Sequence, residues 1–124
     1  EGRLIGSAFD ATGMGWTVAE DIGRDYGLRE KQDDDGLVMP IHFSLSWYRN
    51  NMPAVKQAFG DGSIAIAKSR DHAGDLRLVK VTRGVAKVPD VREGDTNKKR
   101  HGDYAIALAL AVFATRMEWS EFDL

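Results

Sequence analysis

The chain contains no cysteine, which excludes disulfide bonds and thiolate metal sites. It has only three prolines, and its longest run without a polar residue covers ten positions, 105–114. That run is far shorter than the roughly 20 apolar residues that a membrane-spanning helix needs. No signal peptide is recognisable. These absences favour an intracellular protein without a membrane segment, and the start at Glu1 instead of methionine suggests a piece of a longer chain.

The composition is that of one globular domain covering residues 1–124, with 43% hydrophobic and 29% charged residues. The net charge of −2 is unevenly distributed. Residues 80–100 hold seven basic and three acidic side chains, a net +4, which leaves −6 on the remainder. A basic strip of this kind, ending in Lys98, Lys99 and Arg100, indicates either a polyanion contact or a solvated loop.

Several catalytic and nucleotide-binding motifs are also missing. The "GMG" at 13–15 lacks the further glycine of a dinucleotide fingerprint, and no GxxxxGK[ST] phosphate loop occurs. No GxSxG elbow is present, and the three histidines have no metal-binding spacing. The glycines at 13–15 therefore predict a tight strand-to-helix turn, with phosphate contact by the backbone as the alternative.

Strands alternate with helices along the chain, which predicts an α/β fold. A helix over 17–27 is expected from the capping-box spacing of Thr17 and Glu20 and from an apolar stripe at Val18, Ile22 and Tyr26. Pro40 places its strand at a sheet edge or near a strand end, and Pro53 either kinks its helix or begins a second one. The expected strands cover 3–9, 37–43, 63–67 and 85–88, and the other helices cover 44–62, 71–82 and the segment from Asp103 onward.

Two aspartates stand where such folds often carry chemistry. Asp10 ends the first expected strand, and sites in α/β sheets gather at the carboxyl ends of strands. Asp103 begins a helix expected to be buried nearly all round, where it either caps the free N–H groups or presents a carboxylate to a ligand. Hard divalent cations take oxygen ligands, and two of them can promote phosphodiester cleavage.

Other polar residues are expected to be structural. His42 lies in an apolar strand and is interpreted as a structural histidine, and His72 is placed on the surface. Asp71 and Asp75 are interpreted as an exposed helix face, with extra metal ligands as the alternative. The polar stretch 29–36 predicts a solvated surface loop.

The stretches "FDATGMGWTVAEDI" and "RHGDYAIALALA" together resemble the carboxyl-terminal nuclease domain of phage large terminases, particularly the Mu-like prophage type. The likeness spans nearly the whole chain. It implies a partial RNase-H-like fold, with a mixed sheet flanked by helices, and a phage- or prophage-encoded protein in the bacterial host cytoplasm. The implied activity is an Mg²⁺- or Mn²⁺-dependent endonuclease that cuts viral DNA during packaging.

The resemblance also assigns residue roles. Asp10 and Asp103 are implied metal ligands, and His101 lies beside the site, where it either serves the catalysis or packs at the helix start. Lys98, Lys99 and Arg100 are expected to contact the backbone of double-stranded DNA. The portal and the small terminase subunit are implied partners of the complete subunit.

One departure from the family pattern has consequences. The family's first catalytic aspartate lies on an earlier strand, whereas only nine residues precede Asp10. We therefore expect the isolated chain to be weakly active or inactive, and to self-associate or exchange strands through an exposed edge of the Asp10 strand. Two rival interpretations stay open: a non-catalytic module that docks on DNA or portal, and an unrelated α/β nucleotide-binding domain. Cut-site preference, the metal used and the oligomeric state do not follow from the sequence.

Overall fold

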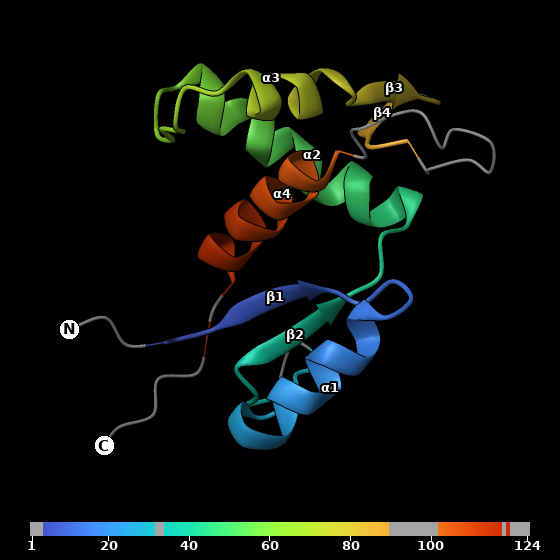
Figure 1. The fold of residues 1–124 in the computed structure, drawn as a ribbon, viewed down its shortest axis with the longest axis vertical. Coiled ribbons are helices and arrows are strands. Elements are labelled where there is room, and N and C mark those ends of the chain that lie inside the picture. Colours follow the sequence, from blue (N-terminus) through green and yellow to red (C-terminus); the bar gives the residue numbers. More distant parts are fainter. Residues whose placement is uncertain (1–3, 32–33, 90–101, 118, 120–124) are drawn as a thin grey trace. The chain divides into compact units, whose positions relative to one another are not determined.

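A computed structural model describes residues 4–31, 34–89, 102–117 and 119. The chain divides into two compact units, one formed by residues 1–43 and 110–124 and the other by residues 44–109. The structure combines helices with small sheets, which is compatible with the predicted α/β class (Figure 1). The expected single mixed sheet is not formed by the described residues, whose strands make one parallel pair and a separate antiparallel pair. Within the described residues, no helix has the length and apolar character that a membrane span requires.

Unit 1 is built around a parallel pair of strands, β1 (Ser7–Asp10) and β2 (Val38–Ile41), joined through helix α1 (Gly15–Tyr26). The helix packs against both strands, as Figure 1 shows. Pro40, opposite Phe9, lies in a strand that pairs only with β1 among the described strands, as its missing N–H predicts.

Small residues take the fully buried positions of α1, and of the predicted apolar stripe Ile22 is half-buried. Ala19 and Gly23 are its buried positions, whereas Val18 and Tyr26 are each about half exposed. A side chain at Gly23 would press on Leu28, so the glycine lets the following segment approach closely. The helix also begins two residues before the predicted Thr17, and its N-cap Met14 makes no side-chain cap hydrogen bond. The capping-box prediction is therefore wrong, while Gly27 ends the helix with φ 83° as expected.

The polar stretch after α1 contains one buried cation, contrary to the predicted surface loop. Arg29 is only 1% exposed, and its Nε donates to the Gly36 carbonyl at 3.0 Å. Its guanidinium lies 5.0 Å from the centre of the Trp119 ring, within the cation–π range. The Oδ2 atom of Asp34 accepts hydrogen bonds from the backbone N–H groups of Lys31 and Glu30, and these bonds lower the pKa of the Asp34 carboxyl group.

Unit 2 contains two helices, α2 (Leu45–Gly60) and α3 (Arg70–Arg77), and a hairpin of β3 (Lys80–Thr82) and β4 (Val85–Lys87). Ser44 caps α2 by accepting the Trp47 N–H at 3.0 Å, and the helix continues through Pro53. Helix α2 packs on β4. The predicted strand at 63–67 is wrong, because this segment has no regular structure.

The predicted helix over 71–82 is also wrong in its second half. Helix α3 ends at Arg77, and Lys80 already belongs to the antiparallel hairpin. Arg83 and Gly84 form its turn with positive φ values of 52° and 77°, which suits the twist of a two-residue hairpin.

Helix α4 (Asp103–Arg116) begins in unit 2 and continues into unit 1. Its alanine- and leucine-rich sequence favours helix, as predicted. It is not buried all round, because Ala107 and Ala111 are exposed whereas Ala105, Ala109 and Leu110 are buried. The small exposed alanines explain why a strongly apolar sequence does not need a core on every side.

Candidate functional site

Asp10 stands at the carboxyl end of β1, as predicted. It is paired in register with Ile41, the last residue of β2, and the next N–H along the chain, that of Ala11, donates to the Ile41 carbonyl at 2.9 Å. The Asp10 Oδ1 atom accepts the Thr12 N–H at 2.9 Å, which fixes the carboxylate against the turn that follows. The side chain is half-buried, so it is held by the protein and reachable from solvent.

The "GMG" turn brings helix α1 directly behind Asp10. Gly13 has φ 59°, a conformation that favours glycine. A Cβ atom at Gly15 would collide with the Asp10 carbonyl oxygen, so only glycine lets the helix begin this close to the strand end. The tight strand-to-helix turn is therefore confirmed.

His42 lies beside this strand end, which the sequence did not indicate. It follows Ile41, the register partner of Asp10, and it is exposed instead of buried in a strand. Its ring lies 5.8 Å from that of Trp16, in the first turn of α1, at an interplanar angle of 33°. The placement of His42 inside a strand is wrong, because β2 ends at Ile41, two residues before the end of the expected strand at 43. The available signal was Pro40, which is typical of a sheet edge or of a position near a strand end.

Asp103 is the first residue of α4 and is exposed. The residue before it, Gly102, has φ 76°, and its carbonyl accepts the first helical hydrogen bond from Ile106 at 3.0 Å. Among the described hydrogen bonds, the Tyr104 N–H of this first turn donates to the side chain of Asp75, and none involves the side chain of Asp103. Asp103 therefore presents its carboxylate outward at the helix tip.

Asp75 and His72 are the residues of α3 that the sequence misplaced. Asp75 is only 2% exposed, and its Oδ2 atom accepts the Tyr104 N–H at 2.9 Å. The His72 ring stacks on the Tyr104 ring, with centroids 3.8 Å apart and an interplanar angle of 6°. His72 and Asp75 are three residues apart and therefore lie near one face of α3, whereas Asp71 is exposed as expected.

The remaining predicted site residues, Lys98, Lys99, Arg100 and His101, lie outside the described residues. Asp10 belongs to unit 1 and Asp103 to unit 2. In the described parts of the chain, no cluster of three or more His, Asp or Glu side chains forms a metal site. Each of the two carboxylates is nevertheless accessible and is of the oxygen-donor type that hard divalent cations take.

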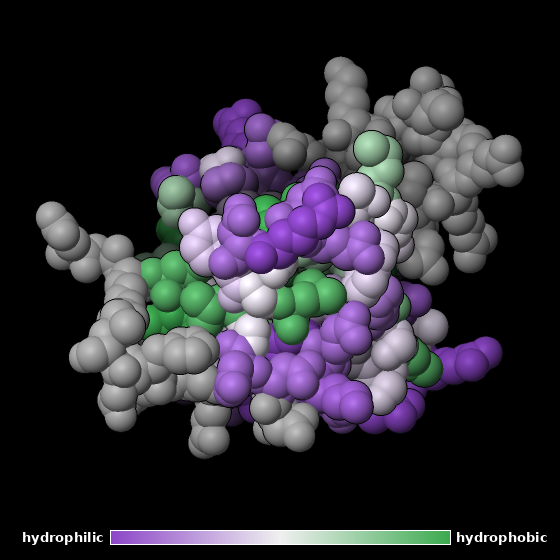
Figure 2. Space-filling view, turned by 90° about the horizontal axis from the view of Figure 1, so that it is seen from below, coloured by the Kyte–Doolittle hydropathy of each residue, from purple (hydrophilic) through white to green (hydrophobic). Residues whose placement is uncertain are grey.

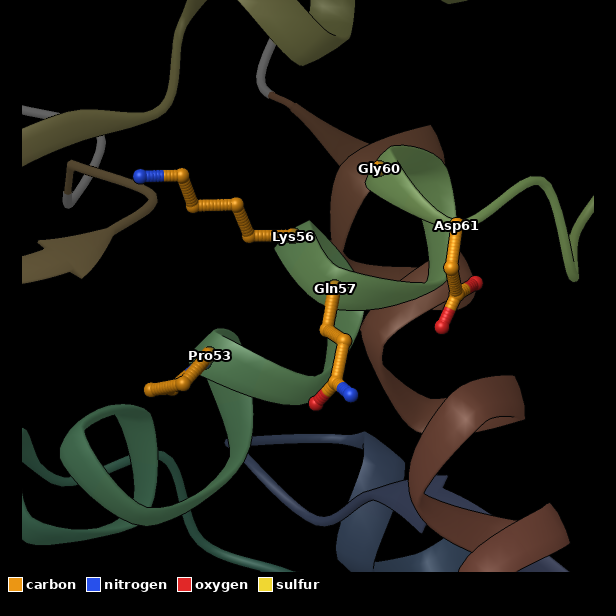
Figure 3. A pocket seen from close by; sticks show the side chains of 5 residues that line it. All are labelled: Pro53, Lys56, Gln57, Gly60 and Asp61. Atoms are coloured by element: carbon orange, nitrogen blue, oxygen red, sulfur yellow. The ribbon is translucent and has the colours of Figure 1, made fainter.

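A separate open pocket of about 470 Å³ lies along α2, and neither Asp10 nor Asp103 lines it. Figure 3 shows its lining, in which the Lys56 side chain extends in a different direction from those of Gln57 and Asp61. Pro53 and Gly60 complete the lining. A shallow surface without convergent polar groups gives no basis for a catalytic site.

Comparison with known proteins identifies relatives along nearly the whole chain. The "Mu-like prophage FluMu protein gp28" of Haemophilus influenzae is 38% identical over 121 residues, covering 98% of this chain and 22% of the relative. The "Probable terminase, large subunit gp28" of Escherichia phage Mu is 36% identical over 117 residues, covering 93% of this chain and 20% of the relative. The chain thus spans about a fifth of the length of these relatives.

No protein-family model matches the chain, and no solved structure matches it. The resemblance to Mu-like terminase large subunits is nevertheless confirmed by the two relatives. This chain is therefore homologous, over nearly all its residues, to one segment of that subunit.

Proposed function

We propose that this chain forms part of a metal-dependent DNA endonuclease in a phage DNA-packaging terminase, with Asp10 and Asp103 as ligands of Mg²⁺ or Mn²⁺. The observation that carries the proposal is the placement of Asp10. Its carboxylate is fixed by the Thr12 N–H at the carboxyl end of two parallel strands, and it is still accessible. That edge is where α/β sheets bind ligands. The homology to a terminase large subunit supplies the DNA-packaging context.

Asp103 completes the proposed ligand pair. A residue that caps its own helix commits its carboxylate to backbone N–H groups. In α4, the Tyr104 N–H is bound by Asp75, and Asp103 is exposed at the helix tip. This arrangement supports a role for the Asp103 carboxylate beyond helix capping.

When bound, the divalent ions would activate water and stabilise the leaving oxygen in phosphodiester hydrolysis. Asp10 and Asp103 would hold them, and the His101 side chain would contact the scissile phosphate or orient a water. Lys98, Lys99 and Arg100 would bind DNA phosphates without reading sequence. The βαβ arrangement of unit 1 supports the RNase-H-like assignment that forms part of this proposal.

The test uses the complete terminase subunit that carries this chain, because the chain spans only about a fifth of its relatives. We expect Asp10→Asn and Asp103→Asn each to lower Mn²⁺-dependent cleavage of double-stranded DNA by at least about 100-fold, since metal ligation contributes several kcal/mol to the transition state. Asp71→Asn, which changes an exposed carboxylate of α3, is the matched control and should cleave normally.

Thermal unfolding of all three variants checks that the fold is retained. Normal cleavage by folded Asp10→Asn and Asp103→Asn would contradict the nuclease proposal. It would instead favour a non-catalytic module that docks the packaging machine on DNA or portal.

A further inference from the structure

The first turn of α4 is held by a side chain from another helix. Asp75 of α3 binds the Tyr104 N–H across 29 residues of sequence. The first four N–H groups of a helix have no partner within the helix, and the preceding residue usually supplies a side-chain acceptor. In α4 the acceptor for the Tyr104 N–H comes from outside the helix.

Gly102 explains why α4 takes its acceptor from outside. It precedes Asp103, so it occupies the position from which a serine or aspartate would normally cap the helix. Its φ of 76° favours glycine, and a Cβ atom there would lie 2.6 Å from the Val88 Cγ1 atom. The backbone conformation and Val88 together exclude a local cap at this position, so the capping group has to reach in from α3.

Helix α3 makes a second contact with the same residue. The His72 ring stacks on the Tyr104 ring with centroids 3.8 Å apart. Asp75 and His72 are three residues apart on α3, so they lie on the same side of that helix. One contact holds the backbone of Tyr104 and the other holds its side chain, so α3 fixes both at the residue directly after Asp103.

We propose that Asp75 is a positioning residue for Asp103: from its buried place on α3 it fixes the first turn of α4 and thereby the Asp103 carboxylate. This inference rests on the proposed function, because it assigns Asp103 a metal to hold. A ligand held loosely by even about 1 Å no longer presents the geometry that a metal site needs. Loss of Asp75 therefore acts on metal affinity through Asp103, without Asp75 touching the ion.

The experiment measures Mn²⁺ binding to the complete terminase subunit by isothermal titration calorimetry, in which Asp75→Ala should weaken the affinity by about 10–100-fold. It also measures the Mn²⁺ concentration that gives half-maximal DNA cleavage. Asp75→Ala is expected to raise this concentration by about 10–100-fold, the range found when groups that orient metal ligands are removed. Saturating Mn²⁺ should restore much of the rate, because the ligands themselves remain. Asp75→Asn keeps an acceptor oxygen for the Tyr104 N–H and should restore the dependence close to that of the unchanged protein.

Asp71→Asn is the matched control on the same helix, with an unchanged Mn²⁺ dependence expected. If Asp75→Ala gives no cooperative unfolding transition, Asp75→Glu takes its place, since it keeps the carboxyl group but displaces it by one methylene; the same rise is expected. An unchanged Mn²⁺ dependence in the folded variant would overturn the positioning role.

Asp103→Asn separates this inference from the proposed function. If Asp103→Asn abolishes cleavage while Asp75→Ala has the normal Mn²⁺ dependence, the nuclease proposal stands and the positioning role of Asp75 is wrong. If Asp103→Asn cleaves normally, the proposed function itself is wrong and the positioning role falls with it.

Discussion

The buried carboxyl group of Asp75 accepts the backbone N–H of Tyr104 at 2.9 Å, which joins helix α3 to the start of helix α4. This hydrogen bond changes the interpretation of the residue beside it. Asp103, which the sequence allowed to be a helix cap, is exposed at the first turn. The sequence motif thus presents one carboxylate to solvent, while a second carboxylate, distant in sequence, holds the helix in place.

Gly15 is expected to tolerate no side chain. In Gly15→Ala, the new Cβ atom would collide with the Asp10 carbonyl oxygen, so the start of α1 must shift. We expect a loss of about 1–3 kcal/mol in the free energy of unfolding, measured by urea denaturation. Gly74→Ala is the matched control, because nothing lies within 4 Å of its Cβ position inside α3. That variant should gain about 0.5–1 kcal/mol, and equal effects at the two sites would contradict the packing described for α1.

Arg29 is expected to be irreplaceable by lysine. Its Nε bond to the Gly36 carbonyl and its position over the Trp119 ring both need a planar guanidinium. Arg29→Lys should lower the free energy of unfolding by about 1–3 kcal/mol. Arg24, whose side chain is 76% exposed and pairs with Asp21, provides the control. Arg24→Lys should change stability by less than about 0.5 kcal/mol, and a similar loss in both variants would show that burial of Arg29 is not the cause.

The order of the main elements could be predicted from local signals. The helix expected at 44–62 corresponds to α2, Gly27 ended α1, and the apolar run after Asp103 gave α4. The alternative that Pro53 begins a second helix was wrong, because α2 continues through it. These signals act within a few residues, so they can be read without knowing the tertiary structure. The position of Asp10 at a strand end followed from the same local pattern.

The errors have a common physical origin in contacts between distant segments. The apolar residues at 63–67 resemble a strand, yet no partner pairs with them among the described strands. Strand β4 corresponds to the strand expected at 85–88, but β3 was missed because its residues fit an exposed helix equally well. The turn that pairs the two strands depends on a positive φ at Arg83. Asp75 is charged and follows a glycine, so only its tertiary contact with Tyr104 shows why it is buried.

The basic segment is expected to determine the salt dependence of DNA binding. Replacing Lys98, Lys99 and Arg100 together by alanine should reduce the slope of log affinity against log salt by about 2–3, because each phosphate contact contributes about 0.9. Filter binding of the complete subunit to double-stranded DNA at several salt concentrations measures this slope. Exposed basic residues elsewhere in the chain, Lys56, Lys68 and Arg77, form the control set. Equal slopes for the two triple variants would argue against a DNA contact at 98–100.

Self-association of this chain is expected to involve the N-terminal side of β1. Among the described strands, β1 pairs only with β2, and the preceding Leu4 and Ile5 are 50% and 65% exposed. Unpaired edges and exposed apolar residues promote association. Hydrophilic residues cover much of the face in Figure 2, but hydrophobic patches interrupt them. Light scattering at high concentration should show a mass above that of the 13.7 kDa monomer.

A charged substitution tests where this association occurs. Ile5→Lys should shift the mass toward the monomer, whereas Val81→Lys, which changes a 73% exposed residue in the β3–β4 hairpin, should leave it unchanged. A monomeric mass for the unchanged chain would contradict the expected association.

The most direct test of the proposed metal centre is a crystal of the complete terminase subunit soaked in Mn²⁺ and measured by anomalous scattering. The proposal predicts an anomalous peak bound by carboxylate oxygens of both Asp10 and Asp103, at about 2.0–2.6 Å as for hard divalent cations. The two carboxyl groups should then lie within about 4–8 Å of each other, close enough to serve ions about 3.5–4 Å apart. Carboxyl groups on opposite sides of the subunit, with no manganese at either, would contradict the account and leave Asp103 without a metal to hold.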